Sequence, residues 1–135
     1  MSDGPVVLFA CVHNSGRSVA ARVLTEHYAA GAVEARSAGS QPKGSVNPVV
    51  AQVLAERGLS TQAEIGTWLS PETVMGADVV VTMGCGESCP FVPGKRYEDW
   101  AVDDPAGQDL DTVRRIVDDV DGRVRALLAE LGVRV

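Results

Sequence analysis

The stretch PVVLFACVHNSGRSVA, residues 5–20, decides the fold that this chain is expected to adopt. It opens with a short apolar run at 5–10 and continues at once into a polar loop. An apolar run without alternation is typical of a parallel strand buried on both faces. Apolar residues then recur at helical spacing over 18–30, and Gly31 follows as a stop signal. The stretch predicts a buried strand, a loop and a helix in direct succession.

The rest of the chain alternates between strand and helix patterns. Further strands are expected at 33–38, 78–83 and 96–100, and further helices at 47–58, from 70 onward and at 110–131. The run at 78–83 is almost entirely β-branched and is expected in the centre of the sheet. Strands that alternate with helices specify an α/β fold, a four-stranded parallel sheet between two helical layers. In such sheets the ligand sits at the carboxyl ends of the strands.

Composition restricts the classes of function. The chain has 135 residues, 45% of them apolar, which suits one domain over 1–135 without room for a second. The formal charge of −6 argues against a nucleic-acid or anionic-membrane surface, because such surfaces cluster Lys and Arg. No apolar run approaches the ~20 residues of a bilayer span, and no basic segment precedes the first strand. We therefore expect a cytoplasmic protein.

The loop after the first strand carries the strongest chemical signal. Cys11 and Arg17 stand six positions apart, between a buried strand and a helix N-terminus. Such a loop can turn its N–H groups inward to cradle an anion, and a planar guanidinium can hold two oxygens of a tetrahedral oxyanion. A thiol in this field ionises readily, and the thiolate is the nucleophile. The predicted oxyanion-binding residues are Val12, His13, Asn14, Ser15, Gly16, Arg17 and Ser18.

Within this loop the residues have different expected roles. Ser18 adds a hydroxyl that can donate to the Cys11 thiolate. Asn14 is expected to support the cradle through an unusual backbone conformation or a bond to the loop, and His13 is expected to face solvent. A buried structural cysteine at a strand end is the alternative for Cys11. The position of the Cys-x5-Arg spacing between strand and helix favours catalysis.

Two further cysteines, Cys85 and Cys89, directly follow the strand at 78–83, and hence lie on the same side of the sheet as Cys11. Thiols four positions apart on a helix have Cα atoms near the ~4.4–6.8 Å range of a disulfide. A zinc site is disfavoured because no second Cys or His pair completes a tetrahedron. Two incidental small residues in a loop are the remaining alternative.

The motifs together resemble a known superfamily. Cys11-x5-Arg17-Ser18, with Ser37-Ala38-Gly39 and Asp104-Pro105, is similar to the low-molecular-weight protein tyrosine phosphatases, which implies their three-layer fold. The stretch 80–83, followed by Cys89-Pro90, Pro93, Trp100 and 103–107, resembles the thioredoxin-linked arsenate reductases of that superfamily over almost the full chain. Ala106-Gly107 stands where the phosphatases usually carry an aromatic residue, so a small oxyanion fits better than phosphotyrosine.

The resemblance implies a three-thiol reduction of arsenate. Cys11 attacks arsenate, Cys85 attacks Cys11 and releases arsenite, and Cys89 resolves the Cys11–Cys85 disulfide. The resemblance also implies that Asp104 is the general acid, and a carboxyl on a proline-fixed loop outside the sheet is suited to that task. The alternative is that Asp103 and Asp104 only solvate a turn.

Partners follow from the same resemblance. Thioredoxin is the expected external reductant of the Cys85–Cys89 pair, and no bound cofactor is expected. Arginine outnumbers lysine ten to two, a bias of GC-rich genomes such as those of actinobacteria, in which mycothiol is an alternative reductant. Some members of this group bind potassium through an acidic residue in the first helix. Here Arg22 stands at that position, so no metal is expected.

The amino-acid sequence alone leaves several properties of the protein undetermined. The two later cysteines stand closer together than is usual in the family, which leaves the geometry of their switch undetermined. The chain is expected to be a monomer or a weak dimer. A phosphatase that hydrolyses a phosphomonoester through a phosphocysteine is the alternative enzyme, and a non-enzymatic oxyanion-binding or redox-sensing module is the alternative outside enzymes.

Overall fold

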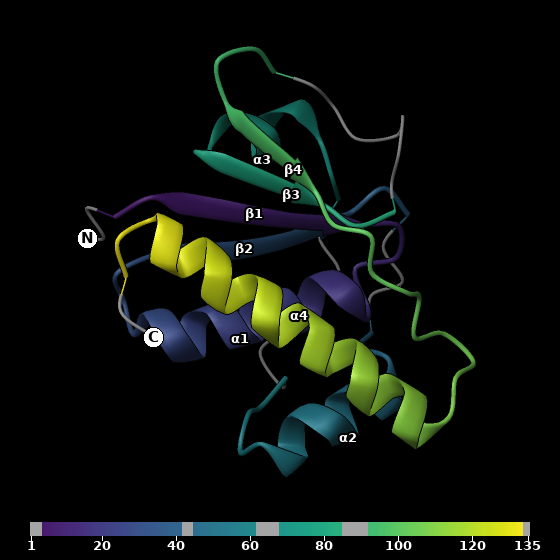
Figure 1. The fold of residues 1–135 in the computed structure, drawn as a ribbon. Coiled ribbons are helices and arrows are strands. Elements are labelled where there is room, and N and C mark those ends of the chain that lie inside the picture. Colours follow the sequence, from purple (N-terminus) through teal and green to yellow (C-terminus); the bar gives the residue numbers. More distant parts are fainter. Residues whose placement is uncertain (1–3, 42–44, 62–67, 85–91, 134–135) are drawn as a thin grey trace.

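A four-stranded parallel sheet organises the molecule (Figure 1). The computed structural model describes residues 4–41, 45–61, 68–84 and 92–133. The strands are β1 (Val6–Cys11), β2 (Glu34–Gly39), β3 (Val79–Thr82) and β4 (Arg96–Asp99), in the order β2-β1-β3-β4. The helices are α1 (Arg17–Ala29), α2 (Pro48–Glu56), α3 (Pro71–Met75) and α4 (Leu110–Glu130). The predicted α/β fold is confirmed, and element bounds differ from the expected ones by one or two residues.

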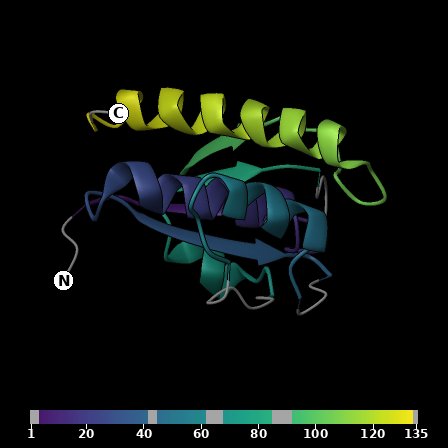
Figure 2. The same ribbon diagram turned by 90° about the horizontal axis from the view of Figure 1, so that it is seen from below.

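The two faces of the sheet have separate apolar cores. Val7, Phe9 and Cys11 of β1 face the larger core, which α1, α2 and α4 cover. Leu8 and Val80 face a smaller core on the other side, completed by residues of and next to α3. Figure 2 shows α4 and α3 on opposite sides of the sheet. All of Val7 to Cys11 is buried, as expected for a strand covered on both faces.

The central pair of strands sets the position of the functional loops. β1 pairs with β3 in parallel register, with Ala10 opposite Thr82, and the Met83 N–H donates to the Ala10 carbonyl at 2.7 Å. The two strands therefore end at the same edge of the sheet. The expected central place of the strand at 78–83, beside the strand that carries Cys11, is confirmed.

The helices differ at their N-termini. In α2, α3 and α4 a side chain accepts hydrogen bonds from N–H groups of the first turn; these caps are Asn47, Ser70 and Asp109. α1 instead begins after Gly16, with no side-chain cap and no acidic residue in its first turn. The first N–H groups of a helix lack intrahelical partners, and the helix dipole makes this end positive. Of the helices described, α1 is therefore the one whose N-terminus is suited to an external anion.

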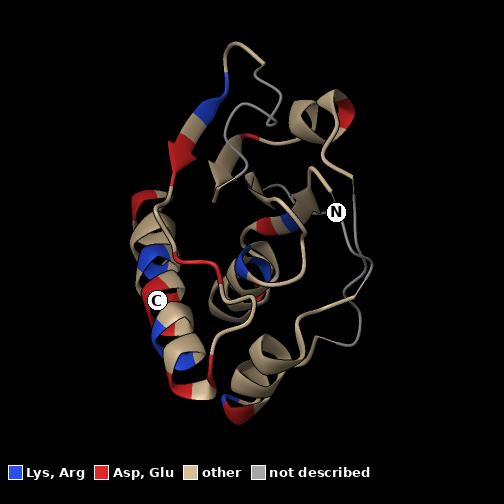
Figure 3. Cartoon of the chain, turned by 90° about the vertical axis from the view of Figure 1, so that its right-hand side faces the viewer, with Lys and Arg blue, Asp and Glu red and all other residues tan. Residues whose placement is uncertain are grey.

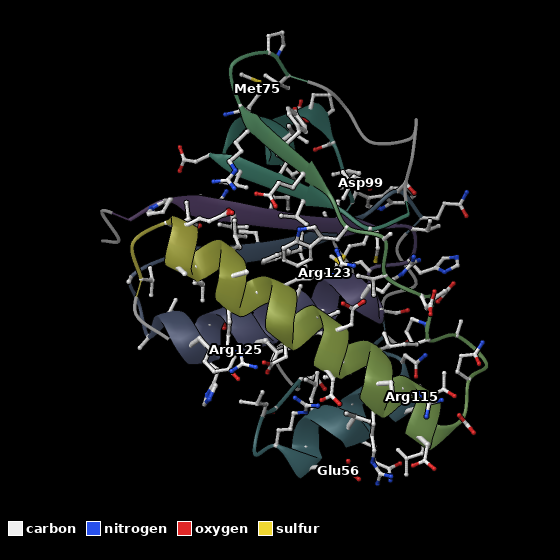
Figure 4. The ribbon with its side chains drawn as sticks, viewed as in Figure 1. Glu56, Met75, Asp99, Arg115, Arg123 and Arg125 are labelled. Atoms are coloured by element: carbon white, nitrogen blue, oxygen red, sulfur yellow. The ribbon has the colours of Figure 1, made fainter. Side chains whose placement is uncertain are left out.

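A buried ionic cluster joins three helices on the side of the sheet that α4 covers. Asp121 of α4, which is 6% exposed, accepts a hydrogen bond from the Tyr28 hydroxyl at 2.8 Å. Arg125, labelled in Figure 4, lies 2.8 Å from the same carboxylate, and Arg57 after α2 lies 3.5 Å away. Paired in this way, the buried charge ties α4 to α1 and to the end of α2. No helix in the described parts of the chain is long and apolar enough to cross a bilayer.

Replacement of Tyr28 by Phe tests this cluster. The Asp121 carboxylate would lose a donor, so the free energy of unfolding should fall by about 1–2 kcal/mol at neutral pH in urea titrations. The hydrogen bond to Asp121 and burial raise the pKa of Tyr28 above 10.0. A pKa raised by folding stabilises the fold below the unfolded value and loses that effect as pH rises through the folded value. The wild type should therefore lose stability above pH 10 more steeply than the variant. Equal stabilities at neutral pH would contradict a contribution from this bond.

Candidate active site

A cavity of about 390 Å³ opens where β1 ends and α1 begins. Cys11, the last residue of β1, lines it and is a free thiol with 2% of its surface exposed. The loop from 12 to 16 curls between that strand and α1. Residues 45–49 and 104–108 form the remaining walls.

Four carbonyl groups in or next to this loop are turned toward partners outside it. They accept backbone N–H groups as follows: Cys11 from Ser40 (3.2 Å), Val12 from Gln41 (2.7 Å), Ser15 from Asn47 (2.7 Å) and Gly16 from Ala20 (2.9 Å). In a trans peptide unit the N–H points opposite to the C=O. The N–H groups of residues 12, 13, 16 and 17 therefore point away from those partners, to the inner side of the loop. The arrangement is a cradle for an anion.

Gly39 of β2 allows the loop to lie this close to the sheet. A Cβ at position 39 would lie 2.6 Å from the Val12 carbonyl oxygen and 2.9 Å from the Asn14 nitrogen. Asn14 itself has a φ of 49° and is 2% exposed, so the expectation of an unusual backbone conformation is confirmed. The glycine of Ser37-Ala38-Gly39 thus has a steric reason in this fold.

A short hydrogen-bond chain starts at the thiol. The Cys11 Sγ lies 3.0 Å from the Ser18 Oγ, and Ser18 donates its hydroxyl proton to the Asn14 Oδ1 at 2.7 Å. A hydroxyl has one proton, so in this arrangement the thiol is the donor to Ser18. When Cys11 ionises, rotation of the Ser18 hydroxyl supplies a donor to the thiolate. Ser18 therefore serves both protonation states of Cys11.

Arg17 lies in the first turn of α1 and lines the same cavity, with 11% of its side chain exposed. Its guanidinium donates to the Val102 carbonyl at 3.5 Å, and one of its nitrogens lies 3.8 Å from the Asp104 Oδ2. Both contacts come from the loop between β4 and α4. The side chain is thus fixed at the cavity wall from a segment far away in the sequence.

The structure separates the two neighbouring aspartates. Asp104 lines the cavity, and its Oδ1 accepts the Ala106 N–H at 3.0 Å, which orients the carboxylate. Pro105 is buried against the cradle, since a Cβ on Gly16 would lie 2.7 Å from its Cγ. Asp103 lines a different hollow together with Asp99, which is labelled in Figure 4. Figure 3 shows the acidic colouring of this loop beside the helix that carries the cradle.

The predicted residues divide into two groups by position. Those that line the cavity are Cys11, His13, Ser15, Gly16, Arg17 and Asp104. Val12, Asn14 and Ser18 build the loop from behind, through the contacts given above. His13, expected to face solvent, is partly exposed and lines the cavity. Cys85 and Cys89 lie outside the described residues.

Sequence reasoning left the segment 45–49 out of the site. The backbone N–H of Asn47 anchors the Ser15 carbonyl, and the apolar side chain of Val49 lines the cavity. The pattern that predicted a helix at 47–58 carried no information on what the start of that helix touches.

Arg22, the residue at the position linked to potassium, points elsewhere on α1. Its Nε donates to Glu26 at 3.0 Å and to the Ala35 carbonyl at 3.2 Å. Within the described ranges, no group of three His, Cys, Asp or Glu side chains is placed to hold a metal ion.

Comparison with known proteins places this site in a family. The model of the family described as low molecular weight phosphotyrosine protein phosphatase matches residues 6–135. The thioredoxin-dependent arsenate reductase of Corynebacterium glutamicum is 42% identical with a TM-score of 0.84, over 96% of this chain and 62% of that one. This chain therefore spans less than two thirds of that protein's length.

Two further relatives match over almost their whole lengths. An arsenate reductase of Archaeoglobus fulgidus is 34% identical with a TM-score of 0.77, over 91% of this chain and 98% of that one. The glutaredoxin arsenate reductase of Synechocystis is 30% identical over 128 residues, which cover 93% of this chain and 97% of the relative. The resemblance found in the sequence is confirmed.

Replacement of Arg17 by Lys tests the cradle without any assumption about turnover. A point charge cannot hold two oxygens as the planar fork does, so the Kd for inorganic phosphate should rise by about tenfold or more in calorimetric titrations. Arg22→Lys, on the same helix but outside the cavity, is the matched control and should bind phosphate as the wild type does. Equal affinities in the two variants would contradict the assignment of Arg17.

Proposed function

Because this chain belongs to the low molecular weight phosphotyrosine protein phosphatase family, we propose that it uses the family's oxyanion cradle to reduce arsenate to arsenite. One observation carries the proposal: a free, buried Cys11 thiol lies in a cavity with an uncapped helix N-terminus and the Arg17 guanidinium. The named relatives reported above are arsenate reductases, which supports arsenate as the oxyanion.

Binding is local, because the protein as a whole repels anions. The formal charge of −6 offers no long-range attraction for a dianion, so affinity comes from inward N–H groups, the dipole of α1 and Arg17. Exposed acidic residues beyond a Debye length of ~8–10 Å are screened at physiological salt. The cradle therefore binds a compact tetrahedral anion inside an acidic protein.

The first chemical step joins sulfur to arsenic. The Cys11 thiolate attacks the arsenic atom of arsenate, an S–As bond forms, and an As–O bond opposite to it breaks. The departing oxygen takes a proton from Asp104 and leaves as water. Asp104 is suited to this role because it lines the cavity on the loop that also contacts Arg17, and a general acid typically contributes about 10²–10⁴-fold.

The second step is the reduction itself. The Cys85 thiolate attacks the Cys11 sulfur, a disulfide forms, and the electron pair of the S–As bond passes to arsenic, which leaves as arsenite. Cys89 then attacks Cys85, which frees Cys11 and leaves a Cys85–Cys89 disulfide. The parallel pairing of β3 with β1 supports this sequence, because the chain reaches Cys85 from the edge of the sheet where Cys11 lies.

An external thiol reductant then restores the pair. Thioredoxin is the proposed reductant, in line with the name of the Corynebacterium relative. Mycothiol is the alternative, and the Synechocystis relative carries glutaredoxin in its name. The proposed cycle needs its thiols in reduced form at the start of each turnover, which a reducing compartment maintains, so we place the reaction in the cytoplasm. A coupled assay of arsenate-dependent NADPH oxidation with each reductant system in turn distinguishes these sources of electrons.

The alternative function is hydrolysis of a phosphomonoester on the same cradle. The cavity favours it in one respect, because its outer wall includes the apolar residues Val49, Pro105 and Ala106, which an ester group can contact. Water would then resolve a phosphocysteine at Cys11, and neither Cys85 nor Cys89 would be needed. Loss of both later thiols therefore separates the two functions: arsenate turnover stops, whereas any phosphatase turnover continues.

Replacement of Asp104 by Asn tests the general acid. The amide cannot deliver a proton to the departing oxygen, so kcat for arsenate should fall by about 10²–10⁴-fold. The Kd for phosphate should change far less than kcat. Asp103→Asn is the matched control, since Asp103 lines a different hollow, and it should retain near wild-type turnover. A larger loss in Asp103→Asn would show that the assignment within the pair is wrong.

Replacement of Cys89 by Ser tests the relay. One round of arsenate should release arsenite and leave a Cys11–Cys85 disulfide, because thiol exchange proceeds through one sulfur at a time. Mass spectrometry of unreduced peptides detects this bridge. Cys85→Ser should form no such bridge, and Cys11→Ser should release no arsenite at all. Sustained wild-type turnover of Cys89→Ser with thioredoxin would contradict the three-thiol sequence and favour a small-thiol reductant.

A further inference from the structure

Gly84 lies directly against the guanidinium of Arg17. It follows β3, and a Cβ built on its backbone would lie 2.5 Å from one terminal nitrogen of Arg17 and 3.3 Å from its Cζ. The second terminal nitrogen would be 3.5 Å away. Real side chains essentially never pack at 2.5 Å, so any residue other than glycine at position 84 must displace this group.

Neighbours on the opposite side limit the directions in which the guanidinium can move. Facing the loop between β4 and α4, the Arg17 guanidinium donates to the Val102 carbonyl at 3.5 Å and lies 3.8 Å from the Asp104 carboxylate. Only 11% of the side chain is exposed. Arg17 therefore lies between the end of β3 and this loop, and pressure from position 84 would turn its N–H fork out of line with the cradle.

We propose that Gly84 is a positioning residue for the oxyanion site, because the space left by its missing side chain holds the Arg17 guanidinium at the cavity wall. This role rests on the oxyanion cradle of the proposed function but not on the thiol relay. Nothing in the sequence around residue 84 indicates it, since a glycine after a strand is explained equally well by a turn. Arg17 and Gly84 are 67 positions apart, and only the pairing of β3 with β1 brings them together.

The chain offers a control for the backbone effect of removing this glycine. Gly84 has a φ of +91°, where an alanine is strained irrespective of space. Gly94 has a φ of +88°, yet a Cβ there would meet nothing within 4 Å. Gly84→Ala and Gly94→Ala should therefore carry a similar backbone cost in urea unfolding. Only Gly84→Ala adds the collision with Arg17.

The test measures inorganic phosphate binding by calorimetry and arsenate kinetics on the full chain. Gly84→Ala should raise the Kd for phosphate by about tenfold, as expected for loss of a well-aligned charged hydrogen-bond pair, and should lower kcat/KM for arsenate in parallel. Gly94→Ala should leave both quantities at the wild-type level. The proposal would be overturned if Gly84→Ala and Gly94→Ala bound phosphate equally well, whether both kept the wild-type affinity or both lost it.

A double variant identifies Arg17 as the group through which Gly84 acts. In an Arg17→Lys background the slimmer lysine side chain places no planar group over residue 84. The double variant should therefore bind phosphate less than about twofold more weakly than Arg17→Lys alone. Full additivity of the two losses would overturn the proposal. If the unmodified chain binds phosphate but does not reduce arsenate, the proposed function is contradicted. The phosphate affinities of the variants then still decide the role of Gly84.

Discussion

The positive end of α1, left without a side-chain cap, is the constraint on which the rest of the site depends. α2, α3 and α4 satisfy N–H groups of their first turns with Asn47, Ser70 and Asp109, whereas α1 begins after Gly16, which has no side chain to do so. Unsatisfied N–H groups at a buried helix start are costly unless a partner arrives. An anion is the partner that both satisfies them and gains from the helix dipole.

Other segments hold this region in a shape that it could not keep alone. Backbone N–H groups of residues 40, 41 and 47 donate to carbonyls of this segment, and Gly39 lets the loop approach β2. The buried Asp121 cluster fixes α4 and the end of α2 over α1. The sheet and the helical layer thus support the cradle from both sides, which favours the preorganisation that oxyanion stabilisation requires.

Three kinds of chemistry meet in one small volume. In the proposed mechanism Arg17 holds oxygens of the anion and Asp104 supplies a proton from the opposite loop. The Ser18 hydroxyl, 3.0 Å from the Cys11 sulfur, reorients as the thiol gains or loses its proton. Gly84, which supports the guanidinium, directly precedes Cys85 in the sequence. The Arg17 guanidinium, which is proposed to bind the oxyanion, thus lies against the segment of chain that leads to Cys85.

The sequence by itself determined the parallel α/β architecture, the central strand pair and the loop with Cys11 and Arg17. These features are local: apolar runs, helical spacing, a glycine stop signal and a motif within eight consecutive residues all act over short stretches of chain. The Asp104 carboxyl was also identified from the sequence, through a resemblance and a proline-fixed loop.

Only the tertiary structure decided which distant groups share the cavity. It placed Asp104 rather than Asp103 at the cradle, brought His13 to the cavity wall, and set Gly84 against Arg17. Such contacts depend on strand order and on the angle at which loops leave the sheet, because residues far apart in sequence have no local pattern that records their distance. The sequence therefore names the chemical groups, and the packing of the sheet and helices determines which of them can act together.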